Sequence, residues 1–132
     1  MAIGVVYLAA LVSFLVIDAI ALKWVMYPLF TEHIGDLLRE NVQVGVALAF
    51  YFIYVSGVVY FAVLPAHEKA SFSLALLNGA ILGFLTYGTY EATNMATIKG
   101  WSMSLVVVDT LWGAVLTATV ASVGYTTARW IL

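Results

Sequence analysis

The chain has 132 residues, of which 64% are hydrophobic and 9% are charged, and its formal net charge is -2. A soluble domain carries about 25% charged residues, so this composition indicates an integral membrane protein. The small net charge gives no reason to expect a nucleic-acid partner, and the lipid bilayer is the expected partner of most of the surface. The sequence contains no cysteine, which excludes disulfides, thiolate metal sites and thiol catalysis.

Four apolar runs each have about the 20 residues that a helix needs to cross a bilayer. They predict an all-α protein, an integral membrane four-helix up-down bundle that forms a single transmembrane domain over residues 1–132. The first run contains Ala19-Ile20-Ala21, which resembles a cleavage site, but no basic segment precedes the run, so we expect a retained helix. The predicted membrane helices cover about residues 3–26, 44–64, 72–97 and 103–131.

The segment between the first two runs is polar. Pro28 is expected to end the first helix or to redirect the chain just after it, because proline cannot continue the hydrogen-bond ladder of a helix. Thr31 can cap a following helix whose apolar residues share one face. The sequence therefore predicts a short interfacial amphipathic helix over about residues 31–40, between the first and second membrane helices. Such a helix is either a plain connector or a lid over a site.

Three acidic residues fall inside the predicted helices at similar depth. Asp18 lies before the end of the first helix, Glu91 before the end of the third, and Asp109 after the start of the fourth. In an up-down bundle these helix ends share one membrane face. At 1.5 Å of rise per residue, all three acids lie roughly 9–12 Å inside the same leaflet. Carboxylates are costly in hydrocarbon, so we expect the three acids to converge.

The helical neighbours of these acids extend the candidate site. Tyr87, Tyr90, Glu91 and Asn94 follow helical spacing and share a stripe on the third helix, and Trp112 shares a stripe with Asp109 on the fourth. The tyrosine hydroxyls, the amide and the indole N–H can donate hydrogen bonds to carboxylates. The predicted ligand or proton site consists of Asp18, Tyr87, Tyr90, Glu91, Asn94, Asp109 and Trp112, with Lys23, His33, Arg39 and Lys99 as supporting residues at the same membrane face.

Three interpretations of the acids remain open. They can be internal glue that locks helices together, a titrating or ligand-binding site, or a metal site completed by His33. The metal interpretation is the weakest, because no paired Glu-x-x-His motif is present, and we predict no metal and no cofactor. Trp101 lies near a predicted helix end and is expected to be an interfacial anchor. Gly79 and Gly83 have the small-xxx-small spacing that favours close helix packing inside the bundle.

The run YGTYEATNMATIKGWSMSLVVVDTLWGAVLT resembles the motif of a family of small bacterial membrane proteins with a domain of unknown function. In that family a Tyr-Gly-Thr-Tyr-acid pattern ends the third of four helices, and Asp-x-x-Trp-Gly follows on the fourth. The acid of the third helix is Glu91 here, where the family pattern has Asp. The resemblance implies a four-helix topology and no activity. The matching positions are Tyr87, Gly88, Thr89, Tyr90, Glu91, Thr93, Asn94, Ala96, Thr97, Gly100, Trp101, Asp109, Trp112 and Gly113.

These features favour a small multi-pass membrane protein, expected in the bacterial inner membrane, whose buried acidic site supports proton- or cation-coupled binding or transport of a small molecule. Transport through so few helices would require at least a homodimer. A second interpretation is a non-catalytic accessory subunit of a larger membrane complex. A third is a lipid-modifying membrane enzyme, but no recognised nucleophile, metal or nucleotide motif favours an enzyme.

Overall fold

The computed structural model describes all 132 residues and contains helices and turns but no strand. The all-α class is confirmed, and four helical stretches are long and apolar enough to cross a membrane: Ala2–Leu37, Val44–Glu68, Phe72–Thr97 and Met103–Ile131. Their elements in order are α1 (Ala2–Ala21), η1 (Leu22–Met26), α2 (Tyr27–Ile34), η2 (Gly35–Leu37), α3 (Val44–Val58), η3 (Val59–Val63), α4 (Leu64–Glu68), α5 (Phe72–Thr97) and α6 (Met103–Ile131).

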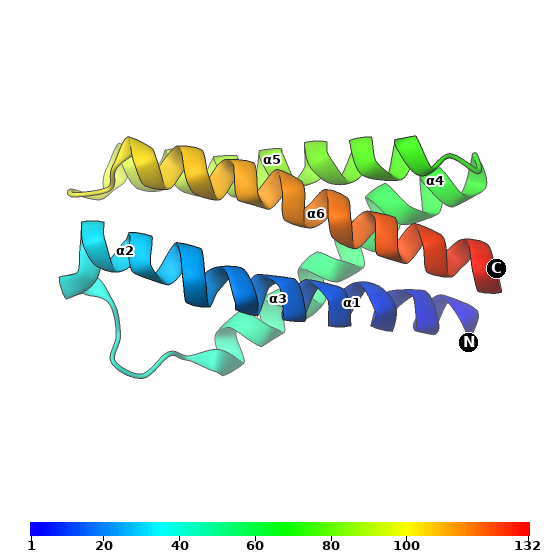
Figure 1. Ribbon diagram of the computed structural model, residues 1–132, viewed down its shortest axis with the longest axis horizontal. Helices are drawn as coiled ribbons and strands as arrows, with labels where there is room; N and C mark the ends of the chain where they lie inside the picture. Colours follow the sequence, from blue (N-terminus) through cyan, green and yellow to red (C-terminus); the bar gives the residue numbers. More distant parts are fainter.

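The four stretches run alternately up and down, and both chain termini lie at the same end of the bundle (Figure 1). α6 is the central helix, because it packs along α5 and α1 and also contacts η3. The second stretch is anchored by η3 against α5 and α6, whereas α3 diverges from the other helices toward the end opposite the termini (Figure 1). The bundle is therefore closed at the terminal end and more open at the other end.

Both prolines lie within helical stretches, which corrects the prediction that Pro28 ends the first helix. A proline has no N–H to donate and its ring presses on the carbonyl four residues earlier. Each proline follows a wider π-helical turn, η1 before Pro28 and η3 before Pro65. A π turn shifts the hydrogen-bond register, so it can absorb the missing donor without breaking the helix.

The interfacial helix predicted over residues 31–40 is also corrected. Residues 31–34 are the last turn of α2, η2 follows, and residues 38–43 are not helical. Thr31 does not cap a new helix, because its hydroxyl donates to the carbonyl oxygen of Tyr27 at 2.8 Å inside the continuing helix. The first helical stretch thus continues beyond the apolar run, and the polar residues that follow this run belong to α2.

Serine caps mark the starts of the last two helices. The Ser71 hydroxyl accepts the backbone N–H of Leu74, at 3.1 Å, and the Ser102 hydroxyl accepts the backbone N–H of Leu105, at 3.2 Å. A side-chain acceptor at this position satisfies one of the free donors at a helix start. The caps fix where α5 and α6 begin on opposite sides of the membrane.

The apolar core lies between α1, η3 and α6. It ties the second helical stretch to the bundle at the same end as the termini, because Val58, Ala62 and Val63 are fully buried there. The opposite half of the interior contains the buried acids. The largest fully buried side chains of this core are Val6, Phe14, Val55, Val58, Val63, Leu116 and Val120.

α5 and α6 approach each other through small residues, as the spacing of Gly79 and Gly83 predicts. A Cβ atom at Gly79 would lie 2.7 Å from the carbonyl oxygen of Thr117, and one at Gly83 would overlap the carbonyl group of Gly113. On the other side, a Cβ at Gly113 would overlap the ring of Tyr87. Close backbone contact is the main means of packing helices in lipid, where burial from water does not drive association.

We predict that Gly83→Ala lowers the free energy of unfolding by about 1–3 kcal/mol, because the new methyl group must push two backbones apart. Gly57→Ala is the matched control, since nothing lies within 4 Å of a Cβ at that helical position. Thermal unfolding of both variants in the same detergent measures the difference. Equal melting temperatures for the two variants would contradict the close contact of α5 and α6.

Candidate functional site

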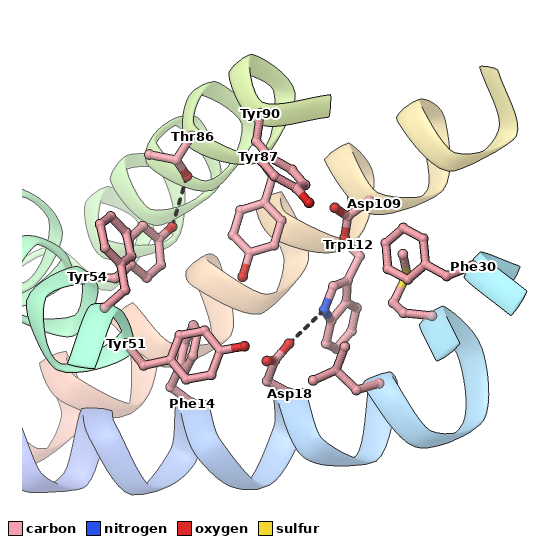
Figure 2. Close-up of a pocket in the computed structure, with 13 residues that line it drawn as sticks. Phe14, Asp18, Phe30, Tyr51, Tyr54, Thr86, Tyr87, Tyr90, Asp109 and Trp112 are labelled. Carbon is pink, nitrogen blue, oxygen red and sulfur yellow. Dashed lines mark hydrogen bonds between the residues drawn. The ribbon is translucent and has the colours of Figure 1, made fainter. Parts of the chain in front are cut away.

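A pocket of about 380 Å³ lies in the open half of the bundle, between α1, α3, α5 and α6. Thirteen residues line it, ten of them hydrophobic, and Asp18 and Asp109 are its two acidic residues (Figure 2). No lysine, arginine or histidine lines the pocket. Most of the lining side chains are aromatic: Phe14, Phe30, Phe50, Tyr51, Tyr54, Tyr87, Tyr90 and Trp112.

Asp18 comes from the last part of α1 and is only 6% exposed. The indole N–H of Trp112 donates to Asp18 Oδ1 at 3.5 Å, which is long for a hydrogen bond. The Tyr51 hydroxyl points toward the same carboxyl from α3 (Figure 2). Asp18 therefore faces polar groups of both α6 and α3 across the pocket.

Glu91 and Asp109 form a pair between α5 and α6. Glu91 is fully buried, and its Oε1 accepts the indole N–H of Trp101 at 2.9 Å. Its Oε2 is buried without a hydrogen-bond partner, and the Asp109 carboxyl lies close to the Glu91 side chain. Asp109, 7% exposed, is the member of the pair that lines the pocket.

The tyrosines of α3 are the part of the site that the sequence reasoning missed. Tyr51 and Tyr54 both line the pocket, one helical turn apart. The Tyr54 hydroxyl shares hydrogen bonds with Thr117, at 2.7 Å, and with Thr86, at 3.2 Å. Their spacing puts them on one face of α3, but this helix is apolar all round, and its sequence does not indicate which face points into the bundle.

Trp101, which is expected to be an interfacial anchor, also makes contacts inside the bundle. Besides donating to Glu91, it packs against Phe30, with ring centroids 5.9 Å apart, and against Tyr90, at 6.2 Å. It comes from the turn between α5 and α6, after Gly100, whose positive φ of 83° suits glycine. Trp101 thus covers the carboxyl pair from the membrane face.

Five of the seven predicted site residues line the pocket, and Glu91 lies close behind Asp109. The five are Asp18, Tyr87, Tyr90, Asp109 and Trp112. Asn94 lies one turn beyond Tyr90 and does not line the pocket. The four expected supporting residues also lie outside it. Lys23 is exposed and lies 5.2 Å from the ring centre of Trp24, and Arg39 is exposed after the first helical stretch. His33 and Lys99 line a separate cavity of about 370 Å³ among the connecting loops.

The side chains are not arranged for a metal. No group of three or more histidine, aspartate and glutamate residues lies close enough to hold a metal ion. The groups that line the pocket are instead aromatic faces, hydroxyls and two carboxyls, which suit an organic molecule.

The fold and the pocket define a four-helix integral membrane protein with an acidic, aromatic cavity in its open half. The comparison with protein families matches residues 3–126 to a family described as predicted membrane protein, DUF2177, a domain of unknown function. Because the match covers nearly the whole chain, the protein belongs to this family. Neither the comparison with curated proteins nor that with solved structures gives a significant match.

We predict that Trp101→Phe lowers the free energy of unfolding by about 1–3 kcal/mol, because it leaves Glu91 Oε1 buried without a donor. Trp130→Phe, at a position that is 85% exposed, is the control and is expected to have little effect. Unfolding in detergent measures both variants.

A double variant separates the lost hydrogen bond from lost packing. Trp101→Phe combined with Glu91→Leu removes both partners, so its loss of stability should be smaller than the sum of the two single losses by at least about 0.5 kcal/mol. Strict additivity would show that the indole N–H does not stabilise Glu91.

Proposed function

We propose that this membrane protein binds a small molecule in the pocket, that Asp109 and Glu91 share a proton, and that binding is coupled to this proton. One observation supports the proposal above all: Asp109 is more than nine-tenths buried and lines the pocket, and the polar side chain close behind it is another acid, Glu91. Acids that serve only as internal glue are normally satisfied by donors. Asp109 keeps acceptor capacity for a group that enters the pocket.

The size and lining of the pocket support a small organic ligand. A volume of about 380 Å³ falls within the range of about 300–1,000 Å³ that small-molecule sites occupy. Such sites are mostly apolar with a few placed polar groups, as here. Phe50 and Tyr90 line the pocket and yet are 63% and 54% exposed, so the pocket opens sideways between α3 and α5. A ligand dissolved in the bilayer can therefore reach it without crossing the loops.

The coupling follows from the cost of charge in a medium of low dielectric constant. Two neighbouring carboxylates repel strongly there, so the Asp109–Glu91 pair holds a proton while the pocket is free of a cation. A ligand that donates a hydrogen bond or carries positive charge competes with that proton. Binding and proton release then become linked, which is the basis of proton-coupled binding or transport.

Binding alone is the part that a single chain can perform. Transport requires a path to the opposite membrane face, whereas the apolar core closes the terminal end of this bundle. A homodimer or a partner subunit would have to supply that path. If the chain is instead an accessory subunit, its pocket should be filled by a partner and should hold no free small molecule.

We expect native mass spectrometry of the protein, extracted gently from its own membrane, to show the chain with a retained small molecule. Thr86→Trp should abolish this mass shift, because Thr86 lines the pocket and the indole fills it. Thr89→Trp on the same helix is the control, since Thr89 is exposed and does not line the pocket. Retention by both variants, or a mass that shows only a fixed larger assembly, would contradict the proposal.

A further inference from the structure

We infer that the ligand of this pocket is a lipophilic organic cation, whose ammonium group lies beside Asp109 and Asp18 within the ring of aromatic side chains. The inference rests on the proposed function and adds the chemical class of the ligand. The same ammonium group can belong to a free organic cation or to the headgroup of a membrane lipid.

The charges around the pocket support a cation. Asp18 and Asp109 line it and Glu91 lies directly behind Asp109, but no basic side chain lines it and Lys23 points elsewhere. A buried carboxylate without a positive partner is strongly disfavoured in lipid. A bound cation supplies that missing partner, whereas an anionic ligand would add a further uncompensated negative charge.

The aromatic lining distinguishes an organic cation from a metal ion. Tyr51, Tyr87 and Trp112 come from three different helices and surround the space in front of the two acids (Figure 2). The faces of such rings attract ammonium groups, and the attraction grows when the site is dry. A metal ion needs several ligating oxygens or nitrogens at one point, and the three acids do not form such a group.

Proton exchange keeps the charge of the site balanced. When the cation settles beside Asp109, the proton shared with Glu91 is no longer needed and leaves, so one proton is released for each cation bound. The Asp109 carboxylate then faces the cation, and Glu91 Oε1 still accepts the indole N–H of Trp101. The titratable groups that face Asp109 are Asp18 from α1, Tyr51 from α3, and Tyr87, Tyr90 and Glu91 from α5.

The first test uses two probes of the same shape, benzyltrimethylammonium and its uncharged carbon isostere neopentylbenzene, with protein in an uncharged maltoside detergent. Quenching of tryptophan fluorescence measures binding, since Trp112 lines the pocket. We expect the cation to bind at least about tenfold more tightly than the isostere. Calorimetry in two buffers of different ionisation enthalpy should show about one proton released per cation.

Variants locate the charge. Asp109→Asn should lower the affinity for the cation at least about tenfold and leave the affinity for the isostere unchanged. Asp36→Asn, at an exposed position outside the pocket, is the control. If Asp109→Asn does not fold, Tyr51 decides, because Tyr51→Leu removes an aromatic face that Tyr51→Phe keeps. Tyr51→Leu should then lower the affinity for the cation more than Tyr51→Phe does.

A third comparison identifies the source of the ammonium group. Protein in nanodiscs of phosphatidylglycerol alone is compared with protein in nanodiscs that also contain phosphatidylcholine. Competition by phosphatidylcholine against the probe would assign the site to a lipid headgroup, and its absence to a free cation.

Equal affinity for the cation and its isostere would overturn the inference, as would equal effects of Asp109→Asn and Asp36→Asn. If Thr86→Trp abolishes such charge-independent binding, the proposed binding function is retained, and only the inference that the ligand is a cation is wrong. If neither probe binds and the native protein retains no molecule, both fail.

Discussion

The close contact of α5 and α6 is the constraint on which the acidic site depends. Gly83 backs directly onto Gly113, and the ring of Tyr87 lies over Gly113 where any side chain would collide with it. With the two backbones held at this distance, the next turns of the helices bring Glu91 against Asp109. A side chain larger than hydrogen at these glycines would move the two carboxyls apart.

The membrane determines what those carboxyls can do. Water cannot solvate them in the hydrocarbon region, so each must meet a donor, a proton or a cation. The chain supplies indole donors sparingly: Trp101 satisfies one oxygen of Glu91 at 2.9 Å, and Trp112 reaches Asp18 only at 3.5 Å. Asp109 receives no such donor. Hydrogen bonding to the carboxyl oxygens therefore becomes less complete toward the pocket, where a ligand could supply the missing partner.

Composition and residue spacing predicted the membrane class and the four helices, because a long apolar run has few alternatives in a bilayer. Counting along the helices also placed Asp18 and Asp109 at one depth, and the structure has both in one pocket. Helix rotation and local exceptions were harder to predict. The all-round apolar α3 does not reveal which face carries Tyr51 inward, and a π turn that absorbs Pro28 has no clear sequence pattern.

The position of the core explains why the pocket can coexist with a stable bundle. Gly124 of α6 lies so close to Val63 that a Cβ atom there would be 2.8 Å from the valine Cγ2, and Ala62 and Val63 are fully buried. The second helical stretch is thus held at η3, ahead of Pro65, while Phe50 in the middle of α3 remains 63% exposed. Phe14 belongs both to the core and to the pocket lining, and Tyr51 and Tyr54 pack against the core, so the apolar core forms the closed floor of the pocket.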